Sequence, residues 1–270
     1  MSFLGVFSKS FGVLASKLVL LVPFLAVAYA VAAFVTPMFA DESSAFFFEV
    51  FNAPLGYVPF QQLPFYAASQ NPEGFTAVVL MTLINLAIGA FFTGVFTAAV
   101  KEKSAAKGFS LAVKRLGGLL ALTFLVSFIY LLFAALAWAL VSLAALTQGV
   151  AGLLLGVAAA VVMLSIFIEL QVRLFLAYPA LMFEKKTAAD ALGKSNAFGR
   201  TRFWKIFGTL AVLYAVIALG SMLDESVSGW LSLQPTELWV DDLVSGLIGA
   251  AVAGYSFIVP AVYYSENRLG

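Results

Sequence analysis

The sequence predicts an all-α protein, a polytopic integral membrane bundle of six transmembrane helices with basic amphipathic helices at the membrane interface. Of its 270 residues, 63% are hydrophobic and 11% are charged, and its mean hydropathy is +1.02. An average soluble domain carries about 25% charged residues. Several uncharged runs reach the roughly 20 residues that a helix needs to cross a bilayer. The basic residues are confined to alternate connections between these runs.

The six predicted spans follow the uncharged runs in order. The third run, 116–168, would reach roughly 80 Å as one helix at about 1.5 Å per residue, so it must hold two helices. Its only polar break is Thr147-Gln148-Gly149, where a glycine can end a helix. We expect one integral membrane domain, 1–270, with helices at about 18–40, 74–100, 116–146, 150–183, 206–223 and 243–265.

Charge placement predicts the orientation of these spans. All 15 Lys and Arg residues lie in segments 1–17, 101–115, 169–205 and 265–270. The opposite connections hold no basic residue and nine of the 14 acidic residues. Under the positive-inside rule, both termini of a multi-pass protein of the cell membrane would then face the cytoplasm.

The absence of Cys and His excludes disulfide-stapled domains and thiolate metal centres, and it removes the usual general base. No GxSxG, P-loop or HExxH motif is present. We therefore expect no enzyme, no cofactor and no metal site. A lipid-modifying enzyme that uses Glu169, Glu184 and Asp190 as metal carboxylates is a less favoured alternative.

An internal repeat is visible in the basic segments. The segments that begin at Glu102 and Lys185 both run from charge to a hydroxyl residue, Ala-Ala, a basic amphipathic stretch and an apolar span. The segment from Phe7 has a similar order. We interpret the fold as three repeated hairpins. For the first segment, any hairpin that follows the positive-inside rule would explain the order as well.

The basic segments are predicted to form interfacial helices. In one segment apolar residues including Phe109 and Val113 share a face, opposite the lysines. In the other, Thr187 begins a capping box and Asp190 pairs with Lys194. The cations can be explained by their role in anchoring and orienting the chain in the membrane. The alternative is that they bind anionic lipid headgroups specifically. The candidate lipid contacts are Lys103, Lys107, Lys114, Arg200, Arg202 and Lys205.

The fourth helix carries the candidate polar pair, Glu169 and Arg173, at i and i+4 with the acid first. Pro179 follows and is expected to kink the helix. If the span begins at Val150, the pair lies at the inner membrane boundary, with its arginine snorkelling. If the span begins later, the pair lies inside the bilayer and is a functional candidate.

The stretch RLFLAYPALMFEKKTAADALGKSNAFGRTRFWKIFG, from Arg173, resembles a signature of largely archaeal multi-helix membrane proteins. They are similar to the membrane domain fused to some glycerophosphoryl diester phosphodiesterases. The matching positions include Arg173, Pro179, Glu184, Ser195, Phe203 and Trp204. The resemblance implies a six-helix membrane domain without the catalytic domain and carries no phosphodiesterase activity to this chain.

The sequence therefore favours transport or membrane organisation that involves lipid-like or anionic solutes. A scaffold or accessory subunit of a membrane complex is the alternative. We expect membrane lipids as partners and no nucleic acid. Membrane-protein partners and a homo-oligomer are both left open.

Overall fold

A computed structural model describes residues 3–31, 39, 69, 71–102, 104–147, 149–184, 186–231 and 238–267. The predicted fold class is confirmed, because the described part of the chain is almost entirely helical and contains no strand. The elements are α1 (Phe3–Ser16), the 3-10 helix η1 (Leu18–Leu20), α2 (Leu21–Ala30), α5 (Pro72–Lys101), α6 (Ala105–Lys114), α7 (Leu116–Leu146), α8 (Gly149–Leu174), α9 (Ala177–Glu184), α10 (Ala188–Thr201), α11 (Phe203–Leu231) and α12 (Leu238–Asn267).

The helices make this a multi-pass membrane protein. Within the described residues, five helical stretches are long and apolar enough to cross a bilayer: Pro72–Lys101, Leu116–Ala144, Gly149–Glu184, Phe203–Trp230 and Val244–Asn267. A sixth span is reached if the bent pair Gly5–Ser16 and Leu18–Val27 is counted as one. That pair bends by 68°. Most of the predicted remainder of the first span, residues 32–38 and 40, lies outside the described residues.

Some helix bounds differ from the sequence expectation. The fourth predicted helix is divided into α8 and α9. Helix α11 continues to Leu231, past the predicted end at Leu223, and includes Asp224 and Glu225. Hydrophobicity marks only the part of a helix that matches a bilayer core, and polar turns can extend it at either end.

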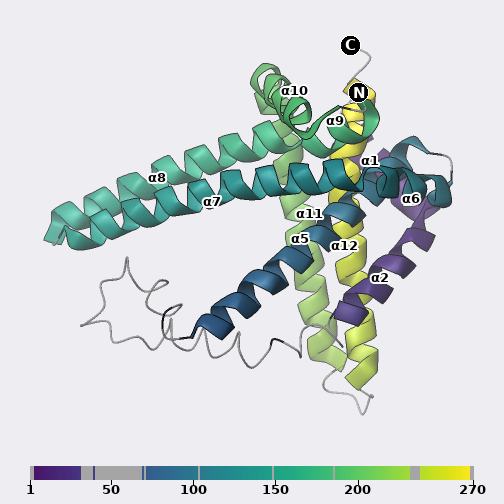
Figure 1. Cartoon of the computed structure of the whole chain (residues 1–270), viewed down its shortest axis with the longest axis horizontal. Helices are drawn as coiled ribbons and strands as arrows, with labels where there is room; N and C mark the ends of the chain where they lie inside the picture. Colours follow the sequence, from purple (N-terminus) through teal and green to yellow (C-terminus); the bar gives the residue numbers. More distant parts are fainter. Residues whose placement is uncertain are drawn as a thin grey trace. The chain divides into compact units, whose positions relative to one another are not determined.

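Contacts divide the chain into two compact units. Unit 1 comprises Met1–Ala28, Gly89–Leu122 and Gln171–Gly270, and unit 2 comprises Tyr29–Ile88 and Thr123–Leu170. Within unit 2, α7 and α8 form the hairpin predicted at Thr147-Gln148-Gly149 (Figure 1), and Gly149 has a φ of 73°. A Cβ at Gly152 would lie 1.6 Å from the Thr147 carbonyl oxygen, so only glycine permits this tight return.

The outer surface of this hairpin is apolar. Leu131 on α7 is 64% exposed and Val150 on α8 is 73% exposed. Exposed apolar area on this scale marks an interaction or membrane surface, because a soluble monomer rarely exposes it. The exposure is what a lipid-facing helix pair requires.

The core of unit 1 lies between its helices and is closely packed. Phe96 of α5, Leu119 of α7 and Ile258 of α12 are fully buried. A Cβ at Gly254 of α12 would come within 3.1 Å of the Phe96 ring and 3.3 Å of the Leu14 side chain. The missing side chain thus brings α1, α5 and α12 together.

Three times a short helix ends at a one-residue break in unit 1 and an apolar helical segment follows. This segment is η1 and α2 after the first break, α7 after the second and α11 after the third. The breaks are at Lys17, Arg115 and Arg202, which we call the junction residues. Their φ/ψ angles are −121/22°, −107/7° and −127/30°. All three lie near the bridge region, between helical and extended backbone.

The three short helices bury the same positions relative to their junctions. The residues three and seven places before the junction are buried in each case: Leu14 and Ser10, Ala112 and Gly108, Gly199 and Ser195. Two of these helices also begin alike. The Ser104 and Thr187 hydroxyls cap α6 and α10 by accepting from the backbone N–H groups of Lys107 and Asp190. The predicted Thr187 cap is therefore confirmed.

Each short helix packs against a returning helix. A Cβ at Gly108 of α6 would lie 3.3 Å from the Ala99 nitrogen of α5. Helix α10 packs on the end of α8 and on α9. Helix α1 packs on α12, the last helix of the chain, where the Tyr255 hydroxyl donates to the Phe7 carbonyl at 3.3 Å. The first segment thus shares its junction and its buried positions with the other two.

Candidate functional site

The candidate site is centred on the break between α8 and α9. Pro179 has no N–H to donate to the Phe175 carbonyl four residues earlier, and its ring crowds that carbonyl. The helix is interrupted at Phe175 and Leu176, four and three residues before the proline. The interruption leaves backbone groups near Arg173 and Leu176 without their usual helical partners, and these groups lie in a buried part of unit 1.

Ser195 of α10 bonds to both sides of this break. Its hydroxyl donates to the Arg173 carbonyl at 2.6 Å and accepts from the Leu176 N–H at 3.1 Å. The Ser195 side chain is fully buried. One hydroxyl thus supplies the two hydrogen bonds that the interrupted helix needs, which explains a serine on the buried face of α10.

The Arg173 side chain also turns toward α10. Its Nη1 donates to the Asn196 side-chain oxygen at 3.1 Å. A Cβ at Gly199 would lie 2.9 Å from the Arg173 Cα, so α10 and the end of α8 approach without an intervening side chain. Glu169, the other member of the predicted pair, is exposed on α8. The structure also joins Arg173 to an amide that the sequence did not single out.

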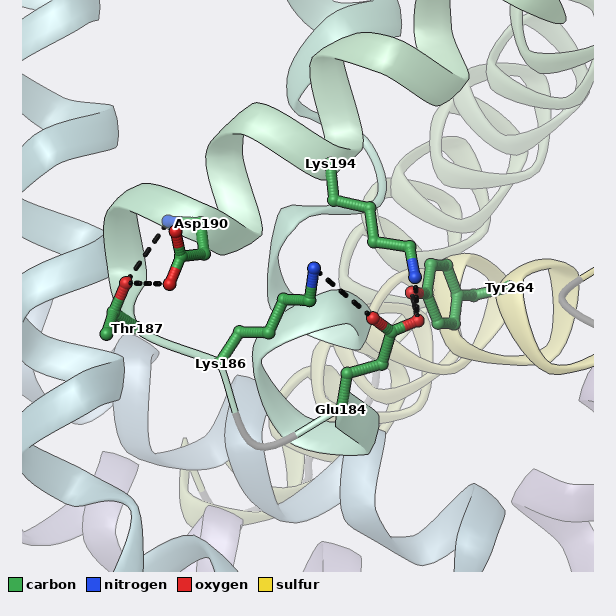
Figure 2. Close-up of polar contacts among 6 residues, drawn as sticks. All are labelled: Glu184, Lys186, Thr187, Asp190, Lys194 and Tyr264. Carbon is green, nitrogen blue, oxygen red and sulfur yellow. Dashed lines mark hydrogen bonds and ion pairs between the residues drawn. The ribbon is translucent and has the colours of Figure 1, made fainter.

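Glu184, at the end of α9, forms the second polar centre (Figure 2). Its carboxylate accepts from Lys194 of α10 and from the hydroxyl of Tyr264 of α12, and Lys186 Nζ lies 3.7 Å from it. The Glu184 side chain is only 9% exposed and Tyr264 is fully buried. Two ammonium groups and a phenol compensate this carboxylate and tie α9, α10 and α12 together.

The predicted pairing of Lys194 with Asp190 is not the contact that the structure places at Lys194. Lys194 reaches Glu184 (Figure 2), and Asp190 lies at the cap, where the Thr187 hydroxyl donates to it at 2.6 Å. The Glu184 carboxylate is less exposed than that of Asp190, so water screens its charge less. It therefore attracts the Lys194 ammonium more strongly than the cap carboxylate does.

The candidate lipid contacts fall into two groups. Lys107, Lys114, Arg200 and Lys205 have exposed side chains. Arg202 is half-buried: its Nη1 donates to the Asn267 side chain at 2.7 Å and its guanidinium lies 5.3 Å from the centre of the Phe198 ring. Lys103 lies outside the described residues.

The family-like motif gathers around these two centres. Arg173, Pro179, Glu184 and Ser195 belong to the contacts just described. Phe203 begins α11 and stacks on Phe207, while Trp204 is 78% exposed. Tyr264, Asn196 and Asn267 were missed by the sequence reasoning. Polar residues at the ends of apolar runs are too common to single out.

The chain matches no family model, no curated protein and no solved structure. The resemblance to the membrane domain of glycerophosphoryl diester phosphodiesterases therefore stays a prediction. Among the described residues, no three Asp or Glu side chains gather as metal ligands would. The geometry of the site joins helices and presents cations next to exposed aromatic and apolar side chains.

Proposed function

We propose that this protein is a non-enzymatic protein of the cell membrane that organises anionic lipids in the cytoplasmic leaflet. Its basic segments and both termini face the cytoplasm in this proposal. The observation that carries it is the surface of α6 and of the α10–α11 region. There the exposed cations Lys107, Lys114, Arg200 and Lys205 alternate with exposed Phe109, Val113 and Trp204.

This combination has the chemistry of a membrane interface. Apolar side chains enter the headgroup and acyl boundary, and neighbouring cations meet anionic headgroups. Helix α6 supports the assignment because it packs through Gly108 and Ala112, while Val113 is 50% exposed. The helix therefore has one face for α5 and a second apolar strip for lipid.

The orientation is tested with single cysteines in this cysteine-free chain. We expect S104C to react with a membrane-impermeant maleimide only after the cells are opened. S228C and S44C, the second outside the described residues, should react in intact cells. Labelling of S104C from outside intact cells would overturn the orientation.

Lipid organisation is tested by quantifying the lipids that co-purify with the full chain. Each basic residue near an anionic surface contributes about 1 kcal/mol, or roughly five-fold in binding. The variant K107Q/K114Q/R200Q/K205Q should retain several-fold less anionic phospholipid. The charge-conserving variant K107R/K114R/R200K/K205R is the matched control and should retain as much as the parent. Equal retention by both would refute lipid organisation through these residues.

Transport of an anionic lipid is the second candidate, and the break between α8 and α9 favours it. Interrupted helices line substrate paths in many transporters. Dithionite quenching of fluorescent phosphatidylglycerol in proteoliposomes measures its movement between leaflets. Movement that S195A slows, in protein that stays folded, would support transport. A bound partner protein without such movement would support the scaffold alternative.

A further inference from the structure

The three junction residues share more than position. Each keeps the chain helical on both sides while changing its direction. The Lys17 N–H bonds the Leu14 carbonyl, the Arg115 N–H bonds the Leu111 and Ala112 carbonyls, and the Arg202 N–H bonds the Phe198 carbonyl. Each junction carbonyl in turn accepts from the next helix, from Leu20, Leu119 and Ile206 respectively. Three places in unit 1 therefore present a side chain from the same kind of backbone.

All three junction side chains are cationic, although the backbone does not require it. A cation at the end of a short helix gains a few tenths of a kcal/mol up to about 1 from the helix dipole. Asn or Gly would serve the bridge-region backbone as well. The common charge therefore indicates a partner outside the helix that is negative.

The surroundings indicate what this partner is. An exposed apolar side chain follows each junction within two residues: Val19 at 64%, Leu116 at 36% and Trp204 at 78% exposure. A cation directly before an exposed apolar position matches a phospholipid, whose phosphate lies just outside its acyl chains. Lys114, Lys205 and Arg200 add charge beside two of the junctions.

We propose that Lys17, Arg115 and Arg202 are three equivalent binding positions for the headgroup phosphate of an anionic phospholipid, one for each hairpin. The inference rests on the proposed function and names the binding positions. Arg202 shows how such a position is prepared. Asn267 and the Phe198 ring hold its guanidinium, and the remaining N–H groups of the planar fork suit a phosphate.

Native mass spectrometry of the full chain, titrated with dioleoyl-phosphatidylglycerol, tests the proposal. We expect three lipids to bind with similar constants, and further lipids at least about five-fold more weakly. K17Q, R115Q and R202Q should each remove one of the three. K101Q is the matched control, because Lys101 is an exposed lysine at the end of α5 that is no junction residue, and it should keep all three.

The outcomes separate this inference from the proposed function. If K101Q loses as much lipid as the junction variants, attraction is general, and the three positions are refuted while lipid organisation stands. If the parent binds phosphatidylglycerol no better than phosphatidylcholine, both fail. R202K keeps the charge without the fork geometry and should retain the third lipid. Retention of that lipid in R202Q, as in R202K, would overturn the assignment of Arg202.

Discussion

Helices α6 and α10 are built to the same plan but are held by different chemistry. Each begins at a capping hydroxyl and ends at a basic junction. Each buries the positions three and seven residues before that junction. Helix α6 uses Ala112 and Gly108 there, against the intact helix α5, whereas α10 uses Gly199 and Ser195, against the interruption between α8 and α9.

The difference shows that the backbone of the helix against which a short helix packs determines which side chain the short helix needs at the contact. An intact helix has no free hydrogen-bonding group along its side, so a small apolar contact suffices and close approach is what matters. An interrupted helix leaves buried polar groups, and a hydroxyl in contact with them avoids a cost of about 1–3 kcal/mol per group. Pro179 and Ser195 thus act together: the proline interrupts the helix, and the serine hydroxyl bonds the backbone groups that the interruption exposes.

The largest effect is expected at Glu184, which anchors α10 through Lys194. Glu184→Ala leaves the buried Tyr264 hydroxyl without its acceptor and two ammonium groups without their carboxylate. We expect a loss of about 3 kcal/mol in the free energy of unfolding, below the full cost of a buried pair because both lysines are partly exposed. Denaturant titration in detergent measures it.

Glu225→Ala removes an exposed carboxylate from α11 and is the control for Glu184→Ala, with an expected change within about 0.5 kcal/mol. Tyr264→Phe should fall between them, at about 1–2 kcal/mol, because it removes one charge-assisted hydrogen bond. A cost for Glu184→Ala no larger than for Glu225→Ala would remove Glu184 as an anchor.

The next largest effect is expected when a buried glycine of α10 or of α6 is replaced by alanine, which compares the packing of the two short helices directly. A Cβ at Gly199 meets backbone, 2.9 Å from the Arg173 Cα and 3.1 Å from the Val172 oxygen. Gly199→Ala should therefore cost about 2 kcal/mol through overpacking. At Gly108 the nearest atom is 3.3 Å away, so Gly108→Ala should cost less, under about 1 kcal/mol.

Gly193, on α10 with no atom within 4 Å of its hypothetical Cβ, is the control for both substitutions. Gly193→Ala should stabilise the helix by about 0.5–1 kcal/mol, because alanine loses less backbone entropy than glycine. The unfolding free energies of the three variants would contradict the comparison if Gly199→Ala behaved like Gly193→Ala.

Much of this architecture could be predicted because hydrophobicity and charge act over whole segments. The all-α membrane fold follows from such patterns, whereas the turn at Gly149 and the Thr187 cap follow from short local motifs. The partner of Lys194 could not, because a lysine can reach several carboxylates and burial selects among them. Pro179 predicted a break in the helix. The hydroxyl that bonds the exposed backbone groups could not be predicted, because it belongs to Ser195, 16 residues later, on a different helix.

Ser195→Ala should cost about 1–2 kcal/mol, since it leaves the Arg173 carbonyl and the Leu176 N–H unsatisfied. Ser165→Ala, at a hydroxyl that bonds the Val161 carbonyl of its own helix at 2.9 Å, is the control and should change little. The decisive variant adds Pro179→Ala, which lets the α8–α9 backbone close its own hydrogen bonds. Ser195→Ala should then cost less, because α10 would face an intact helix as α6 does.

The smallest expected effect concerns Arg173. It compares the coupling energy of Arg173 with Asn196 and that with Glu169. Its Nη1 bonds Asn196 on α10, whereas Glu169 is an exposed carboxylate of α8. An exposed pair one helical turn apart is worth about 0.3–0.5 kcal/mol, and a bond from a charged group in a half-buried place about 1.5 kcal/mol. Two double-mutant cycles, Arg173→Met with Asn196→Ala and Arg173→Met with Glu169→Gln, measure these couplings.

We expect the coupling of Arg173 to Asn196 to exceed its coupling to Glu169, since water or headgroups screen an exposed carboxylate. This order would place the arginine among the contacts that hold α10 and leave Glu169 at the inner membrane boundary. The reverse order, with a coupling of 3 kcal/mol or more between Arg173 and Glu169, would indicate a desolvated pair of about the strength found in protein interiors. In that case Arg173 would serve mainly to pair with Glu169 in the membrane and not to hold α10. The contrast between α10 and α6 would then rest on Ser195 and Glu184 alone.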